Sequence, residues 1–573
     1  MSDIIFETKT ENKLKYEELK KITDGEVCEY RLRLEFSEFA SPSEYTITWK
    51  TAQIDTIGFW SPRHHFDSNI TADWTKRESL SKMTQGAPVV ALYSKSNENR
   101  LTIAVSDPKT PINILAGVVE ETGEIVYEIR FFSEKASTMS EYEAIIRLDT
   151  RKLPFYKAVE AVKGWWSELG YKKAYEPEHA SAPLYSAWYS FHQRTIPEEI
   201  IHECKIAKEY GMDTVIVDDG WQTDDNSRGY GYCGDWEVCE KKIPDMKAFV
   251  DEIHKLDMKF MLWFSVPFVG FYSKNYKRFK GMYLRTRNHI NAKVLDPRFK
   301  EVREFLVGIY ERFVLDYGID GLKLDFIDSF VLEDESSKEY DKMDTVSVED
   351  ATEMLLAEIS ARVKEINPEF LIEFRQSYVG PVISQYGNMF RVTDCPNDPF
   401  VNRIHSLSMR MIQDGCVHSD MMMWNKNESP TALMQQLLST MFTVPQISIR
   451  FDDISNEHKK ILKWYISFWR THKNTILKGA MEYFDVDANF TQARAIGEGE
   501  AVSVLYQGVV SKPLDNTTNY IFNATDKDYI YLELDNDVEY EIFDIYGVKT
   551  KEGRLERGIK KISTGNGGMI KIN

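Results

Sequence analysis

Between about residue 183 and residue 475, the chain alternates short apolar runs with amphipathic helical patterns. This alternation predicts parallel strands joined by crossover helices. Eight such runs can be counted, the number that a TIM barrel requires. They are LYSAWYS (184–190), TVIVDD (214–219), KFMLWFS (259–265), GLKLDF (321–326), FLIEFR (370–375), MFRVTD (389–394), CVHSDM (416–421) and QISIRF (446–451).

Two segments between these runs have clear helical stripes, each of which would face a sheet. One follows Pro244 and carries its apolar residues at Met246, Phe249, Val250, Ile253 and Leu256. The other is VSVEDATEMLLAEISARVKEI, with Val348, Ala351, Leu355, Ile359 and Val363. The charged stretch 330–344 is predicted to be a solvated loop.

The segments on either side of the barrel have strand patterns. Short runs such as YRLRLEF and RLTIAVSD, broken by turn residues, predict an N-terminal β-sandwich, and the last hundred or so residues return to strands without a convincing helix. We therefore predict a multidomain α/β and β protein with a central (β/α)8 barrel. The expected domains are an N-terminal β-sandwich, the catalytic barrel and a small C-terminal β domain, at residues 1–178, 179–475 and 476–573.

Charged residues end several of the predicted barrel strands, where the active sites of such barrels lie. In GLKLDF the two-residue period places Lys323 and Asp325 on one face. A buried salt bridge is the structural alternative to a catalytic role there. TVIVDDGW runs into Asp218, Asp219 and Trp221, although a DDG turn would explain the same residues.

A third strand ends at Asp394, because the following Cys-Pro-Asn-Asp-Pro prevents regular continuation. Asp398 and Arg403 come next, and a helix N-cap or an ion pair explains them equally well. Weaker candidates on or beside the strands are Trp188, Trp263, Ser265, Glu373, Arg375 and Arg391. Carboxylates, cations and aromatic rings at one barrel mouth indicate a pocket for a neutral polyhydroxylated ligand. Cleaving a glycosidic bond with retention requires two carboxyl groups about 5 to 5.5 Å apart.

The composition limits the classes of molecule that the protein is expected to bind. The net charge of −19 disfavours nucleic acid, anionic membranes and strongly anionic substrates. No nucleotide-binding glycine motif, metal motif or cofactor motif is present, so no cofactor and no metal are expected.

The first twenty residues lack an apolar signal region and no run is long enough to span a membrane, which predicts a cytoplasmic protein. Six scattered cysteines indicate neither zinc nor a disulfide framework, although Cys233 and Cys239 are close enough in sequence to pair.

The ordered motifs VDDGW, MLWFS, LDPRFKEVREFL, GLKLDF and a late strand ending in Asp394 resemble glycoside hydrolase family 36. That family contains α-galactosidases, α-N-acetylgalactosaminidases and related transferases. The resemblance implies that Asp325 is the nucleophile and Asp394 the acid/base. It also implies that Asp218 and Asp219 bind the axial 4-OH and the 6-OH of galactose, with Lys323 near the 3-OH and 4-OH. A homo-oligomer is favoured by the same analogy.

The sequence also departs from the family pattern. Trp263 matches a family tryptophan, but FSVPFVG replaces the usual Glu-Pro-Glu run, and EFRQSYVGP replaces a Cys-Ser-Gly-Gly-Gly segment on the 2-substituent side. Arg391 stands three residues before Asp394, whereas the sugar-binding arginine of neighbouring clan members stands four before, and Arg375 is the alternative. Large side chains in place of glycines predict a preference for a free 2-OH.

We therefore expect a retaining exo-α-galactosidase acting on oligosaccharides or other glycosides. The alternatives are an α-N-acetylgalactosaminidase, an α-glucosidase, an α-galactosyl transglycosylase, or a carbohydrate-binding protein that has lost catalysis. Lys323 is expected to lower the pKa of Asp325, and the negative charge of Asp325 is expected to raise the pKa of Asp394 so that it starts protonated.

Overall fold

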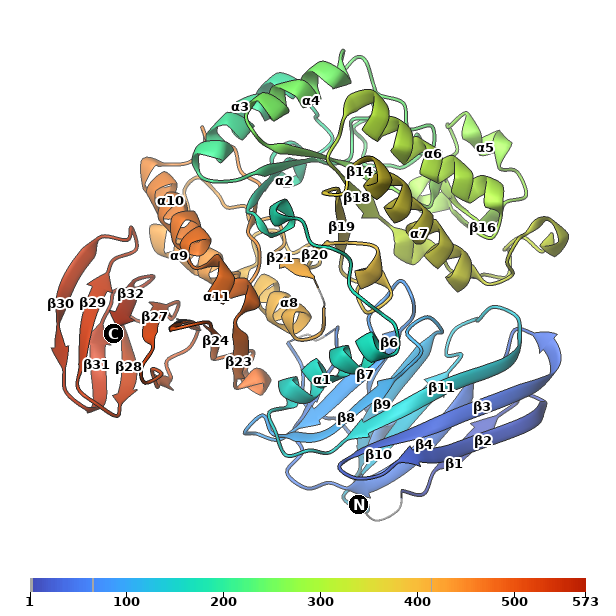
Figure 1. The fold of residues 1–573 in the computed structure, drawn as a ribbon, viewed down its shortest axis with the longest axis horizontal. Helices are drawn as coiled ribbons and strands as arrows, with labels where there is room; N and C mark the ends of the chain where they lie inside the picture. Colours follow the sequence, from blue (N-terminus) through green and yellow to red (C-terminus); the bar gives the residue numbers. More distant parts are fainter. Residues whose placement is uncertain (1–3, 64–65, 414) are drawn as a thin grey trace.

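The fold was determined as a computed structural model, which describes residues 4–63, 66–413 and 415–573. Figure 1 shows the N-terminal sheets below a central barrel, with the C-terminal sheets at its side. The fold predicted from the sequence, a TIM barrel between two β regions, is confirmed.

The N-terminal region is a sandwich of two antiparallel sheets, with strand orders β1-β4-β10-β9-β6 and β2-β3-β11-β8-β7-β5. In β3, Leu32 and Leu34 are buried while Arg31 and Arg33 are exposed, so alternate residues fill the space between the sheets. The strands are β1 Glu7–Thr10, β2 Leu14–Thr23, β3 Val27–Ala40, β4 Tyr45–Ala52, β5 Gly58–Trp60, β6 Arg77–Ser81, β7 Val89–Tyr93, β8 Asn99–Val105, β9 Ile112–Val119, β10 Glu124–Phe131 and β11 Met139–Asp149.

A helix that the sequence reading missed follows the sandwich. Helix α1, Phe155–Glu168, lies within the segment expected to contain strands alone. Its buried residues recur at helical spacing, at Phe155, Ala158, Val159, Val162, Trp165 and Trp166. It packs on β7 and β8 of the sandwich and on α8 (Pro399–Ile412) of the barrel region, so it joins the two.

Eight parallel strands form the barrel, and they occupy the eight predicted positions. They are β12 Leu184–Ser186, β13 Thr214–Val217, β14 Lys259–Ser265, β18 Gly321–Asp325, β19 Leu371–Arg375, β20 Met389–Arg391, β21 Cys416–His418 and β22 Gln446–Ile447. β22 pairs with β12, and a parallel bridge between His418 and Val444 lies on the other side of this last strand. The ring is therefore nearly closed.

Helices cover the outside of the barrel in the order expected for the fold (Figure 1). Helices α4 and α7 bury the two apolar stripes predicted from the sequence, apart from Leu256, which is the C-cap of α4. Between β19 and β20 the chain has a short 3-10 turn, Ile383–Gln385, in place of a long helix. The helices are α2 Trp188–Phe191, α3 Pro197–Glu209, α4 Met246–Lys255, α5 Asn275–Arg278, α6 Lys300–Tyr317, α7 Val348–Ile366, α8 Pro399–Ile412, α9 Pro430–Ser439, α10 Asn456–Thr471 and α11 Lys473–Lys478.

Two further β regions complete the molecule. A small antiparallel sheet, β15 Phe268–Gly270, β17 Ala292–Leu295 and β16 Tyr283–Arg287, is inserted after β14. The C-terminal region has sheets in the orders β23-β24-β25-β27-β32-β29-β30 and β26-β28-β31. Its strands are β23 Ala480–Phe484, β24 Gln492–Ile496, β25 Glu500–Leu505, β26 Val510–Ser511, β27 Thr518–Asn523, β28 Tyr529–Leu534, β29 Val538–Phe543, β30 Lys549–Leu555, β31 Gly558–Ser563 and β32 Met569–Ile572.

Three smaller expectations can be compared with the structure. The charged stretch 330–344 is an irregular, largely exposed segment, as predicted. Cys233 and Cys239, whose pairing the sequence left open, are both free thiols. Within the described ranges, every helix is too short or too polar to cross a bilayer.

Candidate active site

Two neighbouring charges meet at the carboxyl ends of the barrel strands. Lys323 lies in β18, and Asp218 directly follows β13. Nζ of Lys323 donates to Oδ2 of Asp218 at 2.6 Å, and both side chains are buried. The lysine therefore pairs with Asp218, whereas the sequence reading paired it with Asp325 on its own strand. Its charge still acts on Asp325, which fits the shared face that was predicted.

Asp325, at the end of β18, is held by four hydrogen-bond donors. Its Oδ1 accepts from Nε of Arg375 at 2.7 Å, from the backbone N–H of Phe326 at 2.7 Å and from the hydroxyl of Tyr378. Its Oδ2 accepts from Nε1 of Trp263 at 3.1 Å. Phe326 adopts φ +62°, a conformation that a bulky residue rarely takes, and its N–H also donates to the Tyr378 oxygen at 3.0 Å. The carboxylate is therefore fixed in one orientation.

These donors determine the ionisation of Asp325. Burial acts to raise the pKa of its carboxyl, but the charges of Arg375 and Lys323 outweigh burial and hold the pKa far below its usual range. The predicted direction is confirmed. The larger electrostatic contribution, however, comes from Arg375 rather than from Lys323. The lowered pKa favours the ionised form of Asp325.

Arg375 is itself held between two aromatic rings. Its guanidinium carbon lies 5.3 Å from the ring centre of Phe326 and 5.3 Å from that of Tyr378, and Nη1 donates to the carbonyl of Gln376 at 3.0 Å. The side chain is 18% exposed. A cation so placed is rigid, and it stands in the segment where the sequence departs from family 36.

A second group of charges is centred on Arg391, at the end of β20. Its Nη2 lies 2.8 Å from Oδ1 of Asp394, and its Nη1 lies 2.5 Å from Oδ1 of Asp420. Asp420 is fully buried and also accepts from the hydroxyl of Tyr189 at 3.0 Å and from the backbone N–H of Cys395 at 2.7 Å. Asp394, in contrast, has a side chain that is 51% exposed. Arg391 therefore joins a buried carboxylate to one that faces solvent.

The expected ionisation of Asp394 is wrong for the unliganded protein. Burial acts to raise the pKa of its carboxyl, but the charges of Arg391, Arg375 and Lys323 outweigh it and lower the pKa. The sequence reading considered only repulsion from Asp325 and left out the cations. An acid role for Asp394 thus requires the Arg391 ion pair to loosen when substrate is bound.

Asp219 has a different environment from its neighbour Asp218. Its Oδ2 accepts from the side-chain amide of Gln193 at 2.6 Å and its Oδ1 from that of Gln222 at 2.7 Å. Burial raises the pKa of Asp219 to about 6 and is only partly offset by these two neutral donors. Both oxygens already have protein partners, so any sugar hydroxyl must share them.

The N-terminal sandwich reaches the site through the loop after β19. Nε2 of Gln376 donates to the carbonyl of Pro62 at 3.4 Å, and Oε1 accepts from the N–H of Thr393 at 3.2 Å. The N–H of Gly86 donates to the carbonyl of Ser377 at 2.8 Å. Residues of the sandwich therefore support the loop that carries Tyr378 and the segment that carries Asp394.

Some predicted site residues lie apart from this cluster. Trp221 is fully buried, stacks on Trp236 at 5.8 Å and donates from Nε1 to the carbonyl of Trp263 at 2.9 Å. Asp398 caps α8, accepting from the N–H groups of residues 400 and 401 at 3.0 Å each, which is the capping alternative that the sequence left open. Trp188 is partly buried against His192, with ring centres 4.3 Å apart.

Several residues that contact the site were missed by sequence reasoning, among them Asp420, Tyr378, Tyr189, Gln193 and Gln222. Asp420 had a usable signal, because it is the second-last residue of the seventh predicted strand, CVHSDM, much as Asp394 ends the sixth. Tyr378 had none, since it lies in an irregular loop that folds back over β18. In the described part of the chain, no three or more His, Cys, Asp or Glu side chains are grouped so that they would hold a metal ion.

Comparison with known proteins gives the site a family context. Residues 179–412 match the family model described as Melibiase. The predicted resemblance to glycoside hydrolase family 36 is confirmed. Alpha-galactosidase Mel36A of Lactobacillus acidophilus is 35% identical over 130 residues, which is 21% of this chain and 16% of that protein. The bifunctional alpha-galactosidase/sucrose kinase AgaSK of Mediterraneibacter gnavus is 31% identical over 163 residues, 26% of this chain and 16% of that protein. These alignments span about a sixth of the relatives' length.

Similarity of structure extends over nearly the whole chain. The galactosidase domain of AgaSK superposes with a TM-score of 0.65 at 13% identity, covering 96% of this chain and 78% of that one. The family 36 alpha-galactosidase AgaA of Geobacillus stearothermophilus, solved with raffinose, gives 0.64 at 12%, covering 96% and 79%. A family 31 sulfoquinovosidase from E. rectale gives 0.63 at 12%, covering 100% and 88%. At these identities the structures establish the fold and not the substrate.

Proposed function

We propose that this protein is a retaining exo-α-galactosidase that acts by double displacement through a covalent glycosyl-enzyme intermediate. The observation that carries the proposal is the fixed, ionised carboxylate of Asp325 at the mouth of the barrel segment matched by the Melibiase model. Asp394, which follows β20, the next strand but one, supplies the second carboxyl group that glycoside cleavage needs.

In the first step an Asp325 oxygen forms a bond to the anomeric carbon while the glycosidic C–O bond breaks, and Asp394 gives its proton to the leaving oxygen. In the second step Asp394 takes a proton from water, whose oxygen forms the new bond to the anomeric carbon as the ester to Asp325 breaks. Arg375, Tyr378 and Trp263 keep Asp325 oriented throughout. The Lys323–Asp218 pair offers a donor and an acceptor to the hydroxyls of the sugar ring.

The proposed substrates are galactosides in which the sugar is terminal and α-linked. AgaA was solved with raffinose and, in another variant, with stachyose, so oligosaccharides of this kind are the first to test. A carboxylate that accepts from an axial hydroxyl gains about 1.5 to 3 kcal/mol that the equatorial epimer leaves unmade. The rate on an aryl α-galactoside should therefore exceed the rate on the α-glucoside by tens of fold, and the 2-acetamido analogue of the galactoside should be cleaved more slowly than the galactoside itself. Equal rates on the galactoside and the glucoside would contradict the substrate assignment.

The mechanism is tested by chemical rescue. Asp325→Gly should abolish turnover, and azide should restore part of it with a β-glycosyl azide as product, because azide enters from the vacated face. Asp394→Ala should keep a fast first step only on substrates with good leaving groups, and azide should then give the α product. Asp398→Asn is the control, since it keeps a capping oxygen and should retain activity. Release of β-galactose first by the wild type would overturn the retaining assignment.

Three further proposals come from the sequence reading. The domain limits are 1–178, 179–475 and 476–573, to be tested by limited proteolysis. The proposed location is the cytoplasm, which the six free thiols support because disulfides are rare there. A homo-oligomer is favoured by analogy with family 36, and light scattering on the purified protein measures its mass.

A further inference from the structure

Glu373 is a buried carboxylate in the interior of the barrel. It stands opposite Lys323 in the register between β19 and β18, and its side chain is 1% exposed. Its Oε2 accepts from Nε2 of Gln446 across the barrel at 2.6 Å, and that amide also lies 3.3 Å from Nδ1 of His418. Barrel interiors are mostly filled by branched aliphatic side chains, so a carboxylate at this place needs an explanation.

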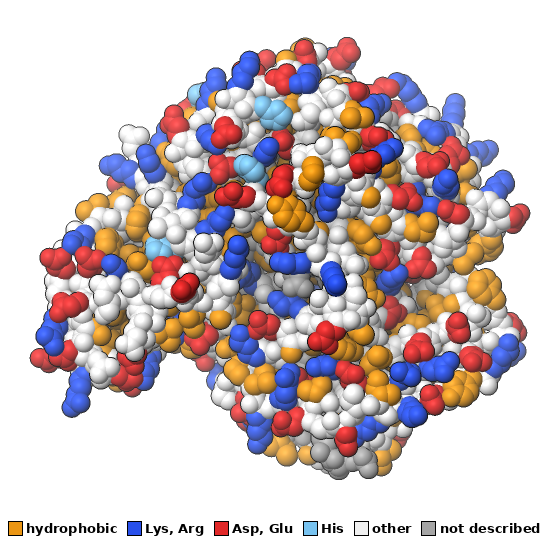
Figure 2. Space-filling view, in the orientation of Figure 1, with side chains coloured by type: hydrophobic (Ala, Val, Ile, Leu, Met, Phe, Trp, Pro, Cys, Tyr) orange, Lys and Arg blue, Asp and Glu red, His pale blue; other side chains and the backbone are white. Residues whose placement is uncertain are grey.

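Charged side chains at the surface have a different environment. Acidic and basic side chains are mixed over the face shown in Figure 2, where water surrounds them. Exposed ion pairs of this kind do little to hold a side chain in one position. A charge inside the barrel has no such solvent, so the few groups that it contacts determine where it lies.

The second oxygen of Glu373, Oε1, lies 3.9 Å from Nε of Arg391. That distance allows electrostatic attraction but is too long for a hydrogen bond. Among the residues that the structure describes, neither atom has a hydrogen-bond partner, although both are buried. Burial also raises the pKa of Glu373, a cost to its ionised form that a closed bond to Arg391 would offset. An unbonded donor and an unbonded acceptor this close together indicate a hydrogen bond that forms in another state of the site.

Arg391 presents one edge of its guanidinium to two carboxylates. Nε and Nη2 lie on the same edge of that planar group, and Nη2 is 2.8 Å from Oδ1 of Asp394. Nη1, at the other end, is held by Oδ1 of Asp420 and by the carbonyl of Val392. With Nη1 fixed, a small rotation of the guanidinium can bring Nε to Glu373 while it moves Nη2 away from Asp394. The two carboxylates therefore compete for one edge of Arg391.

We propose that Glu373 is a positioning residue for the acid/base step, which takes over Arg391 when substrate binds and so frees Asp394 to protonate the leaving oxygen. The proposal rests on the proposed galactosidase function and on Asp394 as its acid/base. Glu373 itself exchanges no proton with the substrate. The contact between Nη2 and Asp394 opens and the contact between Nε and Oε1 of Glu373 closes, while Asp420 keeps Nη1.

The test compares kcat/KM on two substrates that need different amounts of acid assistance. Glu373→Gln keeps the shape of the side chain and an acceptor for Gln446 but removes the charge. On an aryl α-galactoside with a poor leaving group, kcat/KM should fall about tenfold or more, because the acid-competent state loses a charge-assisted hydrogen bond. On α-galactosyl fluoride kcat/KM should be nearly unchanged, because fluoride leaves with little protonation.

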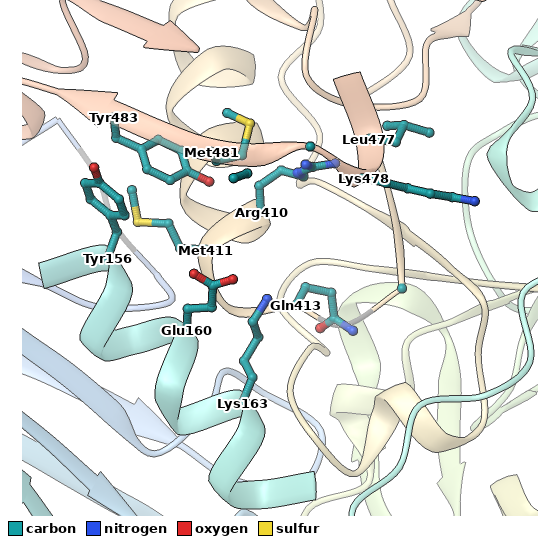
Figure 3. A pocket seen from close by; sticks show the side chains of 13 residues that line it. Tyr156, Glu160, Lys163, Arg410, Met411, Gln413, Leu477, Lys478, Met481 and Tyr483 are labelled. Atoms are coloured by element: carbon teal, nitrogen blue, oxygen red, sulfur yellow. The ribbon is translucent and has the colours of Figure 1, made fainter. Parts of the chain in front are cut away.

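Two glutamate variants serve as controls, and both should keep the wild-type ratio of the two kcat/KM values. Glu203→Gln is matched in burial, because Glu203 is 1% exposed and contacts Nε of Arg450 at 2.9 Å from helix α3. Glu160→Gln is the distant control. Glu160 lines the pocket of about 380 Å³ in Figure 3, at the C-terminal end of α8. Asp394 precedes the other end of this helix of 14 residues, and the two ends are about 20 Å apart.

The effect of Glu373 must also depend on Arg391. Arg391→Lys has a single ammonium group and no Nε edge, so adding Glu373→Gln to it should cause no further loss on the poor leaving group. Additive losses in the double variant would show that Glu373 acts by another route and would overturn the proposal.

A structure of the wild type with a non-hydrolysable α-thiogalactoside keeps the proposal testable if Glu373→Gln does not fold. Nε of Arg391 should then lie at hydrogen-bond distance from Oε1 of Glu373, with Nη2 withdrawn from Asp394. A separation that stays at 3.9 Å would overturn the exchange. A wild type that cleaves no α-galactoside would refute the proposed function and the exchange with it. An active wild type in which Glu373→Gln slows both substrates equally, or neither, would refute the exchange alone.

Discussion

Among single residues, Arg391 joins two carboxylates, because it contacts both Asp394 and Asp420. Asp420 is buried and keeps the guanidinium in place, while Asp394 faces solvent. If Asp394 is the acid/base, as we propose, it begins as half of an ion pair, and substrate binding must release it from Arg391. We infer that the leaving-group oxygen takes the place of Arg391 as the partner of Asp394.

This arrangement predicts a pH effect. The pKa of Asp394 lies below its usual range in the free protein, and kcat/KM reports free-protein pKa values, so kcat/KM should fall as the pH rises above that pKa. Arg391→Lys keeps the charge but loses the paired donors, so the pKa of Asp394 should rise. The alkaline limb should then move upward by about one pH unit, since one unit corresponds to about 1.4 kcal/mol.

The measurement is the pH profile of kcat/KM on an aryl galactoside with a poor leaving group. The same profile on α-galactosyl fluoride, which needs little acid assistance, should not shift. Arg362→Lys serves as the exposed control. Coincident alkaline limbs for wild type and Arg391→Lys would show that Arg391 does not set the ionisation of Asp394.

At this scale the sequence predicted which side chains gather but not how they pair. Strand periodicity places Lys323 and Asp325 on one face, and the end of the strand places Asp394 at the mouth. Which side chains pair depends on how far each one extends from its own strand toward a neighbouring strand. Nε of Arg375 bonds to a carboxylate 50 positions away, and no local pattern encodes that contact.

Among the elements, the turn after β13 is held by a lysine that forms no ion pair with any carboxylate of the described residues. Nζ of Lys242 donates to the carbonyls of Gln193 and Gly220, at 2.6 Å and 2.9 Å, and to Oδ1 of Asn226 at 2.7 Å. It thus ties three loop segments around Asp219. The neighbouring Lys241 is exposed and pairs with Asp224 at the surface.

The two lysines form a matched pair of variants. Lys242→Met should cost about 1 to 3 kcal/mol of unfolding free energy, because two carbonyls lose their donor, and it should raise KM as the Asp219 turn loosens. Lys241→Met should change stability by no more than about 1 kcal/mol, as exposed ion pairs do. Urea unfolding and steady-state kinetics on both proteins provide the comparison. Equal stability losses would mean that the turn does not depend on Lys242.

The positions of the helices and strands were predicted better than the residues at which they end. All eight barrel strands were found, but several predicted runs extend past the last residue of the strand, among them LYSAWYS, TVIVDD, MFRVTD, CVHSDM and QISIRF. Helix α1 was missed although Ala158, Val162 and Trp165 recur at helical spacing, since the strand-rich neighbourhood dominated the reading. The inserted sheet β15–β17 has strands of three to five residues, too short for periodicity to reveal.

In the whole molecule, the N-terminal sandwich is part of the environment of the candidate site. Gly380 makes this contact close: its φ is +111°, and a Cβ there would lie 2.7 Å from the carbonyl oxygen of Gly86. Gln376 and Tyr378 precede it in the same loop. The sandwich therefore contacts the loop whose Tyr378 donates to Asp325.

Gly380→Ala should lower both stability and kcat/KM, because the new methyl group strains the backbone and pushes the loop from the sandwich. A stability loss above about 1 kcal/mol is expected. Gly308→Ala in α6 is the control, since nothing lies within 4 Å of its Cβ position and helical alanine is favoured by about 0.4 to 1 kcal/mol. If Gly380→Ala lost stability but kept wild-type kcat/KM, docking of the sandwich would not be what positions the site.

The contact between Pro62 and Gln376 joins residues 314 positions apart, and this separation has a consequence for folding order. Contacts between residues far apart in sequence close late, because the entropy of the intervening chain must be lost first. A refolding chain can assemble its barrel strands, which are mostly neighbours in sequence, before the sandwich docks on the barrel. We therefore expect the proposed activity to return last during refolding, after the barrel has regained its native spectroscopic signals.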